Sequence, residues 1–254
     1  MTYLLRHEEA GPALATAREL TGFFTAPQEG ESEQEPGGWR PFQLLGCVLE
    51  PELTQLLDHP RRRELPNVDV VILADTGQPI GAYYVGGPTV LAQHPTTDGS
   101  VDLLLNGYFF RYPNLAAGPV WAEWRRAFPP APGGWATGGP EHRAGWLEAI
   151  RVHATTVGRP RPDDRPAGTS YELAGGAVTD PPAFYCALGE AINGPAGYFG
   201  GNSDALRDCL AGGFGARVPF RLVWHDFAVA RRSLPDLDRL LEPLLAAGVE
   251  IEQR

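Results

Sequence analysis

The C-terminal part of the chain is organised around the stretch Tyr198-Phe199-Gly200-Gly201-Asn202-Ser203-Asp204-Ala205-Leu206-Arg207-Asp208-Cys209-Leu210. Gly200 and Gly201 can adopt backbone angles that other residues resist, so they predict a tight turn. Asn202 is a favoured helix N-cap, because its side-chain oxygen accepts a hydrogen bond from the first helical turn. Gly212 and Gly213 are typical of a helix end. The stretch therefore predicts a turn followed by a short helix over residues 203–212.

Two faces of this predicted helix differ in chemistry. Leu206 and Leu210 are four residues apart and form an inward apolar stripe. Asp204 and Asp208 are also four apart, on another face, where like charges destabilise an isolated helix by about 0.2–0.5 kcal/mol. The helix dipole also opposes Asp208, which lies near the C-terminal end. The pair is either a solvated face, softened by Arg207, or a set of carboxylates kept for a cationic partner.

The spacing of Tyr, Gly, Asn, Asp-Ala-Leu and Asp-Cys-Leu in this stretch resembles the signature of the barstar family, the intracellular inhibitors of barnase-type ribonucleases. The segment Pro219-Phe220-Arg221-Leu222-Val223-Trp224-His225-Asp226-Phe227 resembles the family's second strand. A strand-like segment that ends at Leu173-Ala174-Gly175 resembles its start, and the Leu-rich last helix with Val249-Glu250-Ile251 resembles its end. The resemblance covers residues 168–254.

Strand and helix signals alternate along this region. Strands are expected at 168–173, 219–224 and 249–252, and helices at 181–192, 203–212 and 235–247. Strands separated by helices imply parallel pairing through right-handed crossovers. The resemblance implies the same α/β fold, a three-stranded parallel sheet with flanking helices, and a cis peptide bond at Val218-Pro219. Asp180 is expected to cap the first helix, and Pro243 to kink or split the last one.

The N-terminal part, residues 1–157, resembles no family that we recognise. It is predicted as a separate α+β domain around a mostly antiparallel sheet. Its composition predicts an acidic surface loop over 27–41 and helices over 10–24, 51–58 and 115–128. Strands are predicted at 42–49, 68–74, 80–85, 89–93 and 101–105, while 146–153 fits either strand or helix. The Pro-rich, charged stretch 158–167 is the predicted linker between the two domains.

Composition restricts the partners and the compartment. The chain has 254 residues, a formal net charge of -10 and no lysine. An acidic chain disfavours nucleic acid and suits a basic protein partner. Cys47, Cys186 and Cys209 are widely spaced, which predicts buried free thiols in a reducing compartment rather than disulfides or a zinc site. The start of the chain lacks a signal-peptide pattern and no apolar stretch is long enough to span a membrane, so we expect a cytoplasmic protein.

The sequence carries no convincing catalytic motif. Its six histidines show no HExxH spacing, no GxSxG elbow is present, and neither a Rossmann nor a phosphate-loop pattern is found. Cys209 is on the apolar side of its helix, which predicts an inert thiol rather than a nucleophile. We therefore expect a protein that is not an enzyme and that uses no metal or cofactor.

The resemblance implies an intracellular bacterial inhibitor of a secreted, guanyl-preferring ribonuclease. In such a complex Asp208 would enter the cationic active site in place of phosphate, Asp204 would pair with a neighbouring basic group, and Tyr198 would pack on the enzyme. The residues expected to bind the partner are Tyr198, Phe199, Gly200, Asn202, Asp204, Arg207, Asp208, Ala211 and Glu242.

The motif also departs from the family. Arg207 stands where the family has tryptophan, Ala211 replaces a threonine, and Gly213 replaces a second tryptophan. The family's acidic residue on the last helix falls near Pro243, with Glu242 adjacent. Two alternatives therefore stay open: an immunity protein or other binding module for a different toxin or partner, with the N-terminal domain contributing specificity, and an enzyme whose site lies in that domain.

Overall fold

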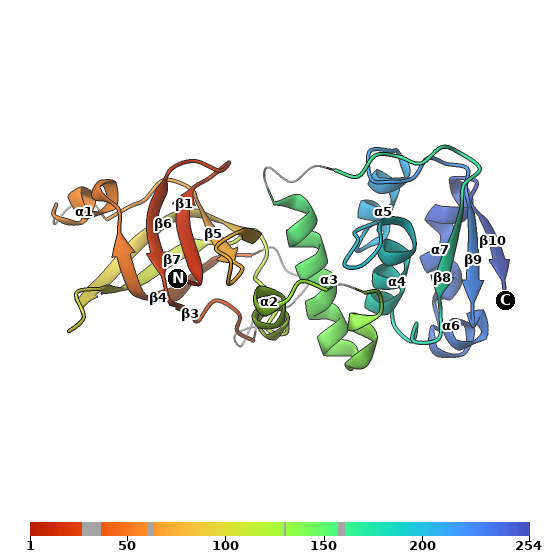
Figure 1. Cartoon of the computed structure of the whole chain (residues 1–254), viewed down its shortest axis with the longest axis horizontal. Coiled ribbons are helices and arrows are strands. Elements are labelled where there is room, and N and C mark those ends of the chain that lie inside the picture. Colours follow the sequence, from red (N-terminus) through yellow and green to blue (C-terminus); the bar gives the residue numbers. More distant parts are fainter. Residues whose placement is uncertain (27–36, 60–62, 130, 157–160) are drawn as a thin grey trace. The chain divides into compact units, whose positions relative to one another are not determined.

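The computed structural model describes the chain except residues 27–36, 60–62, 130 and 157–160. The chain folds into two compact units, which Figure 1 shows in sequence colours. The first comprises Met1–Ala127 together with Thr156–Gly158, and the second comprises Phe128–Thr155 and Arg159–Arg254. Most of the predicted acidic loop and the start of the predicted linker lie outside the described residues.

The first unit is an antiparallel sheet of seven strands in the order β2-β1-β5-β6-β7-β4-β3, and a further pairing of β2 with β4 closes the sheet on itself. Two helices accompany it, α1 (Pro51–Leu57) and α2 (Ala117–Arg126). The predicted antiparallel sheet is confirmed. Its strands are β1 (Tyr3–His7), β2 (Ala13–Ala17), β3 (Glu19–Thr21), β4 (Trp39–Leu49), β5 (Val68–Leu73), β6 (Pro79–Pro95) and β7 (Val101–Tyr108).

The predicted helix over residues 10–24 is wrong. The segment forms the strands β2 and β3 instead, with β2 between β1 and β4. Leu14 and Ala17 are buried, as the helix pattern required, but they lie in a strand whose backbone pairs with neighbouring segments. The N–H of Thr2 donates to the carbonyl of Ala17, and the N–H of Glu50 donates to the carbonyl of Leu14. Tertiary pairing here overrides the high helix propensity of alanine.

The other predicted elements of this unit are largely confirmed. The hairpin predicted over 68–85 is present, with β5 and β6 joined by a turn in which the N–H of Gly77 donates to the carbonyl of Ala74. The two strands predicted at 80–85 and 89–93 form the single strand β6, which keeps its pairing through irregular register near Gly86. Trp121 and Trp124 of α2 are buried, as the pattern predicted.

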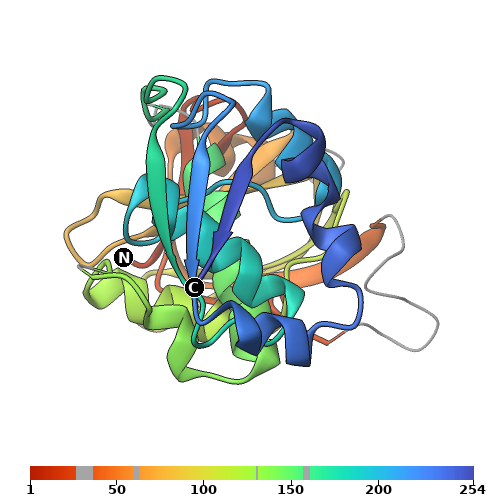
Figure 2. The ribbon, with the colours of Figure 1, turned by 90° about the vertical axis from the view of Figure 1, so that its right-hand side faces the viewer.

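The second unit contains a parallel sheet of three strands in the order β10-β9-β8, as predicted. Figure 2 shows these strands in front, with helices of the same unit behind them. The elements are the 3-10 helix η1 (Gly134–Thr137), α3 (Pro140–Thr155), β8 (Ser170–Ala174), α4 (Pro181–Asn193), α5 (Ser203–Leu210), β9 (Arg221–His225), α6 (Phe227–Ser233), α7 (Leu237–Ala246) and β10 (Glu250–Gln253).

The core of the second unit lies between this sheet and its helices. Trp224 of β9 is fully buried, stacks on Phe184 of α4 at a centroid distance of 5.5 Å, and meets Phe227 edge to face. Helix α6 was not predicted. It has only seven residues and is separated from the end of β9 by one residue, so no separate helical pattern stands out in the sequence. Helix α7 continues through Pro243 to Ala246, so the expected split is absent there; the proline removes only the one intrahelical hydrogen bond that an N–H at this position would donate to the carbonyl of Arg239.

Helix α3 packs on α4, so the second unit begins earlier than the predicted linker. Residues 146–153, which fitted either strand or helix, lie in this helix, with Trp146 and Ile150 buried. Arg143 donates from Nε to Asp180 Oδ2 at 2.8 Å, while Asp180 Oδ1 accepts from the N–H of Ala183 at 2.8 Å and caps α4 as predicted. The Pro-rich composition of residues 158–167 predicted the domain boundary there. Helix α3 precedes that stretch, yet its buried side chains make it part of the second unit.

None of the helices in the described part of the chain combines the length and the apolarity that a membrane span needs.

We expect Arg143→Ala to lower the stability of the second unit by about 3 kcal/mol, because it leaves the mostly buried Asp180 carboxylate without its cation. Hydrogen–deuterium exchange of peptides from 181–193 reports this unit separately from the first. Arg232→Ala, at an exposed position of α6, is the matched control and should change protection by less than about 0.5 kcal/mol. Equal protection in the two variants would contradict a structural role for the α3–α4 ion pair.

Candidate protein-binding site

Helix α5 begins at a loop that glycine makes possible. Gly200 has φ +91°, and a Cβ at this position would lie 2.9 Å from the Cα of Leu206. Asn202 has extended backbone angles, and its Oδ1 accepts a hydrogen bond from the N–H of Ala205 at 2.8 Å. The predicted turn and N-cap are therefore confirmed. Together they fold the loop closely against the helix that it starts.

The inward side of α5 is apolar, as its spacing predicted. Leu206, Cys209 and Leu210 are buried. Burial raises the pKa of the Cys209 thiol to about 12, so the thiol stays protonated at neutral pH. A protonated thiol is a poor nucleophile, which agrees with the predicted inert role. Cys47 and Cys186 are also free and buried.

The outward side of α5 carries a small ion-pair network. Arg207 Nη1 lies 3.0 Å from Asp204 Oδ1, and Arg207 Nη2 lies 2.8 Å from Glu242 Oε2 on α7. The Arg207 and Glu242 side chains are about half exposed and that of Asp204 is 94% exposed, so solvent screens both pairs. Arg207 thus joins two helices and neutralises part of the charge of two carboxylates.

Asp208 differs from the two other carboxylates of this surface. Its side chain is exposed and, within the part of the chain that the structure describes, its carboxylate has neither an ion pair nor a hydrogen bond. It lies in the C-terminal half of α5, where the helix dipole does not stabilise negative charge. A cation supplied from outside the chain would therefore meet a carboxylate that no internal partner compensates. We call the exposed side chains of Asp204, Arg207, Asp208 and Glu242 the α5 face.

An aromatic cluster borders the α5 face. The Tyr198 ring, half-buried in the loop before the helix, meets Phe214 edge to face at a centroid distance of 6.3 Å. The guanidinium of Arg161 lies 4.8 Å from the centre of the Phe214 ring. Burial raises the pKa of the Tyr198 hydroxyl to about 12, and the negative charge of Asp208 acts in the same direction. Tyr198 is therefore a neutral hydrogen-bonding group at physiological pH.

A side chain from the predicted linker fixes the loop that follows α5. Asp164 accepts hydrogen bonds from the backbone N–H groups of Gly213, Phe214 and Gly215 at 2.8–3.1 Å. Gly213 and Gly215 have positive φ, which lets their N–H groups converge on one carboxylate. The hydrogen bond from Gly213, with those from the next two residues, lowers the pKa of Asp164. The loop is thus held by a charged side chain from outside the motif.

The model of the family described as Barstar (barnase inhibitor) matches residues 169–254. This region is a barstar domain. The first unit matched no family, and neither the curated proteins nor the solved structures contain a match to the chain. The barstar domain takes up all three parallel strands and helices α4 to α7, while η1, α3 and the Asp164 segment lie outside the matched residues.

The structure brings most of the expected partner-binding residues to one side of the barstar domain. Phe199 is the exception, because its side chain is fully buried and packs on Phe220 at 6.3 Å, so its ring is part of the core. Gly200 is also buried and serves as backbone. The cis peptide bond at Val218-Pro219 is present. Exposed positions are Asn202, Asp204, Arg207, Asp208, Ala211 and Glu242, with Tyr198 partly exposed.

The sequence missed two contacts of this site. Arg207 was expected beside the aspartates of its own helix, but its ion pair with Glu242, which is 35 residues further along the chain, had no local signal. No local signal existed for Asp164, which is 49 residues before Gly213. Among the described residues, no group of three or more His, Cys, Asp and Glu side chains is arranged to hold a metal ion.

We expect Asp164→Asn to destabilise the second unit by about 1–3 kcal/mol at pH 7, since three N–H groups lose a charged acceptor. The folded pKa of Asp164 is lowered, so its contribution is complete above the ordinary aspartate pKa and is lost as pH falls through the folded value. The difference from wild type, measured by urea unfolding, should therefore shrink from pH 7 to pH 3. Asp163→Asn, at the exposed neighbouring position, is the control. A difference that is the same at both pH values would refute the charge-dependent contact.

Proposed function

We propose that this chain is a cytoplasmic inhibitor of a secreted, guanyl-preferring ribonuclease of the barnase type, and that it is not an enzyme. The observation that carries the proposal is the exposed Asp208 carboxylate, without a partner among the described residues, on α5 of a barstar domain. The family description names barnase inhibition; the particular target and the mechanism are inferred from the α5 face.

The proposed mechanism is occupation of a cationic site by carboxylates. A ribonuclease binds the phosphates of RNA with arginine, lysine and histidine side chains, so its active site attracts anions. Asp208 would enter that site and take the place of a phosphate. Removal of water from the complex strengthens the ion pairs, provided that every charge finds a partner. The unpaired state of Asp208 in the free inhibitor means that no internal ion pair has to break first.

The surroundings of Asp208 favour binding by a preformed surface. Gly200 and the Asn202 cap fix the start of α5, and Asp164 fixes the loop after its end. A surface that is already ordered loses less conformational entropy on association. Tyr198 adds a half-buried aromatic ring, a residue type that is common at the centres of protein interfaces.

Arg207 narrows the choice of target. The α5 face contains three carboxylates and one guanidinium, a net charge of -2, with the guanidinium between Asp204 and Glu242. A uniformly basic enzyme surface would be repelled by Arg207. The second candidate is therefore an immunity protein for a different toxin, favoured by Arg207 together with Ala211 and Gly213 at positions where the family has larger side chains. In that second case the first unit would contribute specificity.

The proposal is tested by titrating the whole chain into RNA-cleavage assays with barnase and other guanyl-preferring bacterial ribonucleases. We expect stoichiometric inhibition of at least one enzyme. Asp208→Asn, which removes the charge and keeps the shape, should weaken binding by about 2–5 kcal/mol, the range for one partner of a desolvated charge pair, for which barnase and barstar are the reference case. Asp236→Asn, at another exposed aspartate, should leave inhibition unchanged. Inhibition that survives in Asp208→Asn would exclude the proposed mechanism, and no inhibition of any enzyme would favour the second candidate.

Arg207→Ala tests the electrostatic part separately. The substitution raises the net negative charge of the α5 face and frees Asp204 and Glu242. Association with a basic ribonuclease should become several-fold faster at low ionic strength, and the gain should disappear as salt is added. Stopped-flow kinetics measure both effects, with Arg232→Ala as the distant control. Slower association of Arg207→Ala would instead show that the enzyme presents an acidic group to Arg207.

A further inference from the structure

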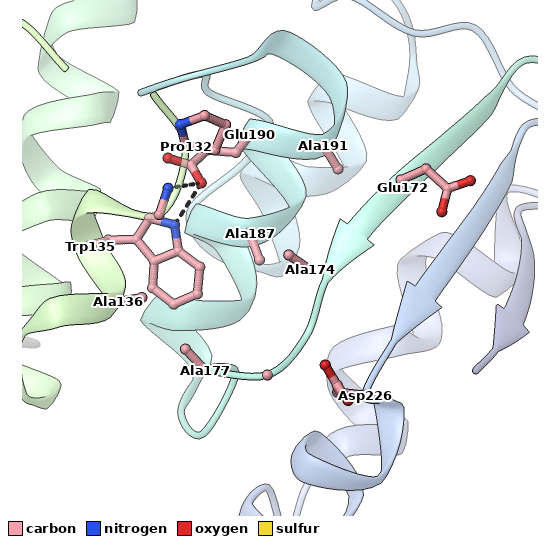
Figure 3. A pocket seen from close by; sticks show the side chains of 12 residues that line it. Pro132, Trp135, Ala136, Glu172, Ala174, Ala177, Ala187, Glu190, Ala191 and Asp226 are labelled. Carbon is pink, nitrogen blue, oxygen red and sulfur yellow. Dashed lines mark hydrogen bonds between the residues drawn. The ribbon is translucent and has the colours of Figure 1, made fainter. Parts of the chain in front are cut away.

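A groove of about 480 Å³ runs beside β8, one of the two edge strands of the three-stranded sheet. Its strand side is formed by Glu172, Ala174 and Gly176. The opposite wall comes from α4 and from the segment around η1, as Figure 3 shows. We call this space the β8 groove. None of the residues that line it belongs to the α5 face.

The backbone of β8 is unpaired on its groove side. The carbonyl of Thr169 accepts from the N–H of Arg221, and the N–H of Gly175 donates to the carbonyl of His225, so the odd-numbered residues of this strand bond to β9. In a parallel pair, alternate residues direct both peptide groups to the same neighbour. The peptide groups of Ser170, Glu172 and Ala174 therefore point away from β9, and β8 pairs with no other strand in the described chain.

These exposed peptide groups repeat every second residue. The repeat is about 6.6–6.8 Å, which is the spacing of hydrogen-bonding groups along another extended chain. A compact small molecule does not match that repeat, whereas an added strand satisfies it. The opposite wall has small side chains, Ala187 and Ala191 of α4, which leave room for the side chains of such a segment.

The charge of the groove selects a basic occupant. Of the residues that line it, all within the described chain, Glu172, Glu190 and Asp226 are acidic and none is basic. Glu190 is fixed in the wall, because its Oε2 accepts from the N–H of Gly133 and from Trp135 Nε1, both at 2.9 Å (Figure 3). The Asp226 carboxylate is exposed, with no hydrogen bond or ion pair among the described residues.

The same charges oppose pairing of two copies of this edge. A second copy of β8 would bring another Glu172 and Asp226 to a groove that already holds three carboxylates. Edge strands commonly use such charges to prevent self-association. A basic extended segment would instead be attracted to the carboxylates of the groove.

We propose that the β8 groove binds an extended, basic polypeptide segment of a partner protein by strand addition. The segment pairs with the peptide groups of Ser170, Glu172 and Ala174, places small apolar side chains over the alanines of α4, and directs arginine or lysine toward Glu172 and Asp226. Glu172 also meets His225 Nε2 at 2.5 Å, but its side chain is 62% exposed and can still accept a cation from the segment. This binding does not depend on ribonuclease inhibition, because it uses other elements of the domain.

The test selects a phage-displayed library of random dodecapeptides against the whole chain and then measures a fluorescent synthetic copy of the enriched sequence. We expect enrichment of peptides with two or more basic residues. In NMR spectra of the complex, the amide hydrogens of Ser170, Glu172 and Ala174 should exchange at least tenfold more slowly, while those of Tyr171 and Leu173 stay as they are. Replacing the basic residues of the peptide by glutamate should abolish binding.

Two variants change the groove without removing the hydrogen bonds between β8 and β9. Ala174→Pro removes one edge N–H without touching the ladder to β9, and Ala191→Arg fills the groove from α4 and adds a positive charge. Each should weaken binding of the selected peptide at least tenfold. Ala246→Arg, at an exposed position of α7, is the matched control and should bind like wild type. Failure to enrich any peptide, enrichment of peptides without basic residues, or unchanged binding to Ala191→Arg would overturn the proposal.

Discussion

The ion pairs of Arg207 decide the electrostatic character of the barstar domain's binding side. Solvent-exposed ion pairs such as Arg207–Asp204 and Arg207–Glu242 contribute only about 0–1 kcal/mol to stability. Their larger effect is on the distribution of uncompensated negative charge over the α5 face. By engaging Asp204 and Glu242, Arg207 leaves Asp208 as the carboxylate of this face that is uncompensated within the described chain, so a cation from a partner gains most at one position.

The remainder of the site depends on side chains that bind backbone N–H groups. Asp180 caps α4, Asn202 caps α5, and Asp164 holds the loop after α5. Each satisfies donors that a helix end or turn would otherwise leave unpaired. Asp180 is in turn held by Arg143 of α3, outside the residues that the family model matches. The geometry of the barstar domain is therefore supported by segments that precede it in the chain.

Local patterns predicted the parts of this protein that local forces determine. The Gly200 turn, the Asn202 cap and the inward Leu206 and Leu210 all follow from neighbouring residues, and all are present. The helix expected over residues 10–24 failed because pairing of this segment with β1 and with the more distant β4 outweighed alanine propensity. The hydrogen bond between Asp164 and Gly213 joins residues 49 apart, and no spacing rule connects them. Phe199 shows the same limit, since a motif position does not reveal which way its ring points.

The α5 face and the β8 groove are both acidic, but they suit partners of different shape. Carboxylates that project from a helix can enter a concave cationic site, because each side chain reaches beyond the backbone. A strand edge beside a groove requires the reverse, a partner that is extended and lies in the protein's own concavity. A folded, basic ribonuclease fits the first description and a flexible basic segment fits the second. Negative charge alone therefore does not choose the partner; the backbone geometry that carries the charge does.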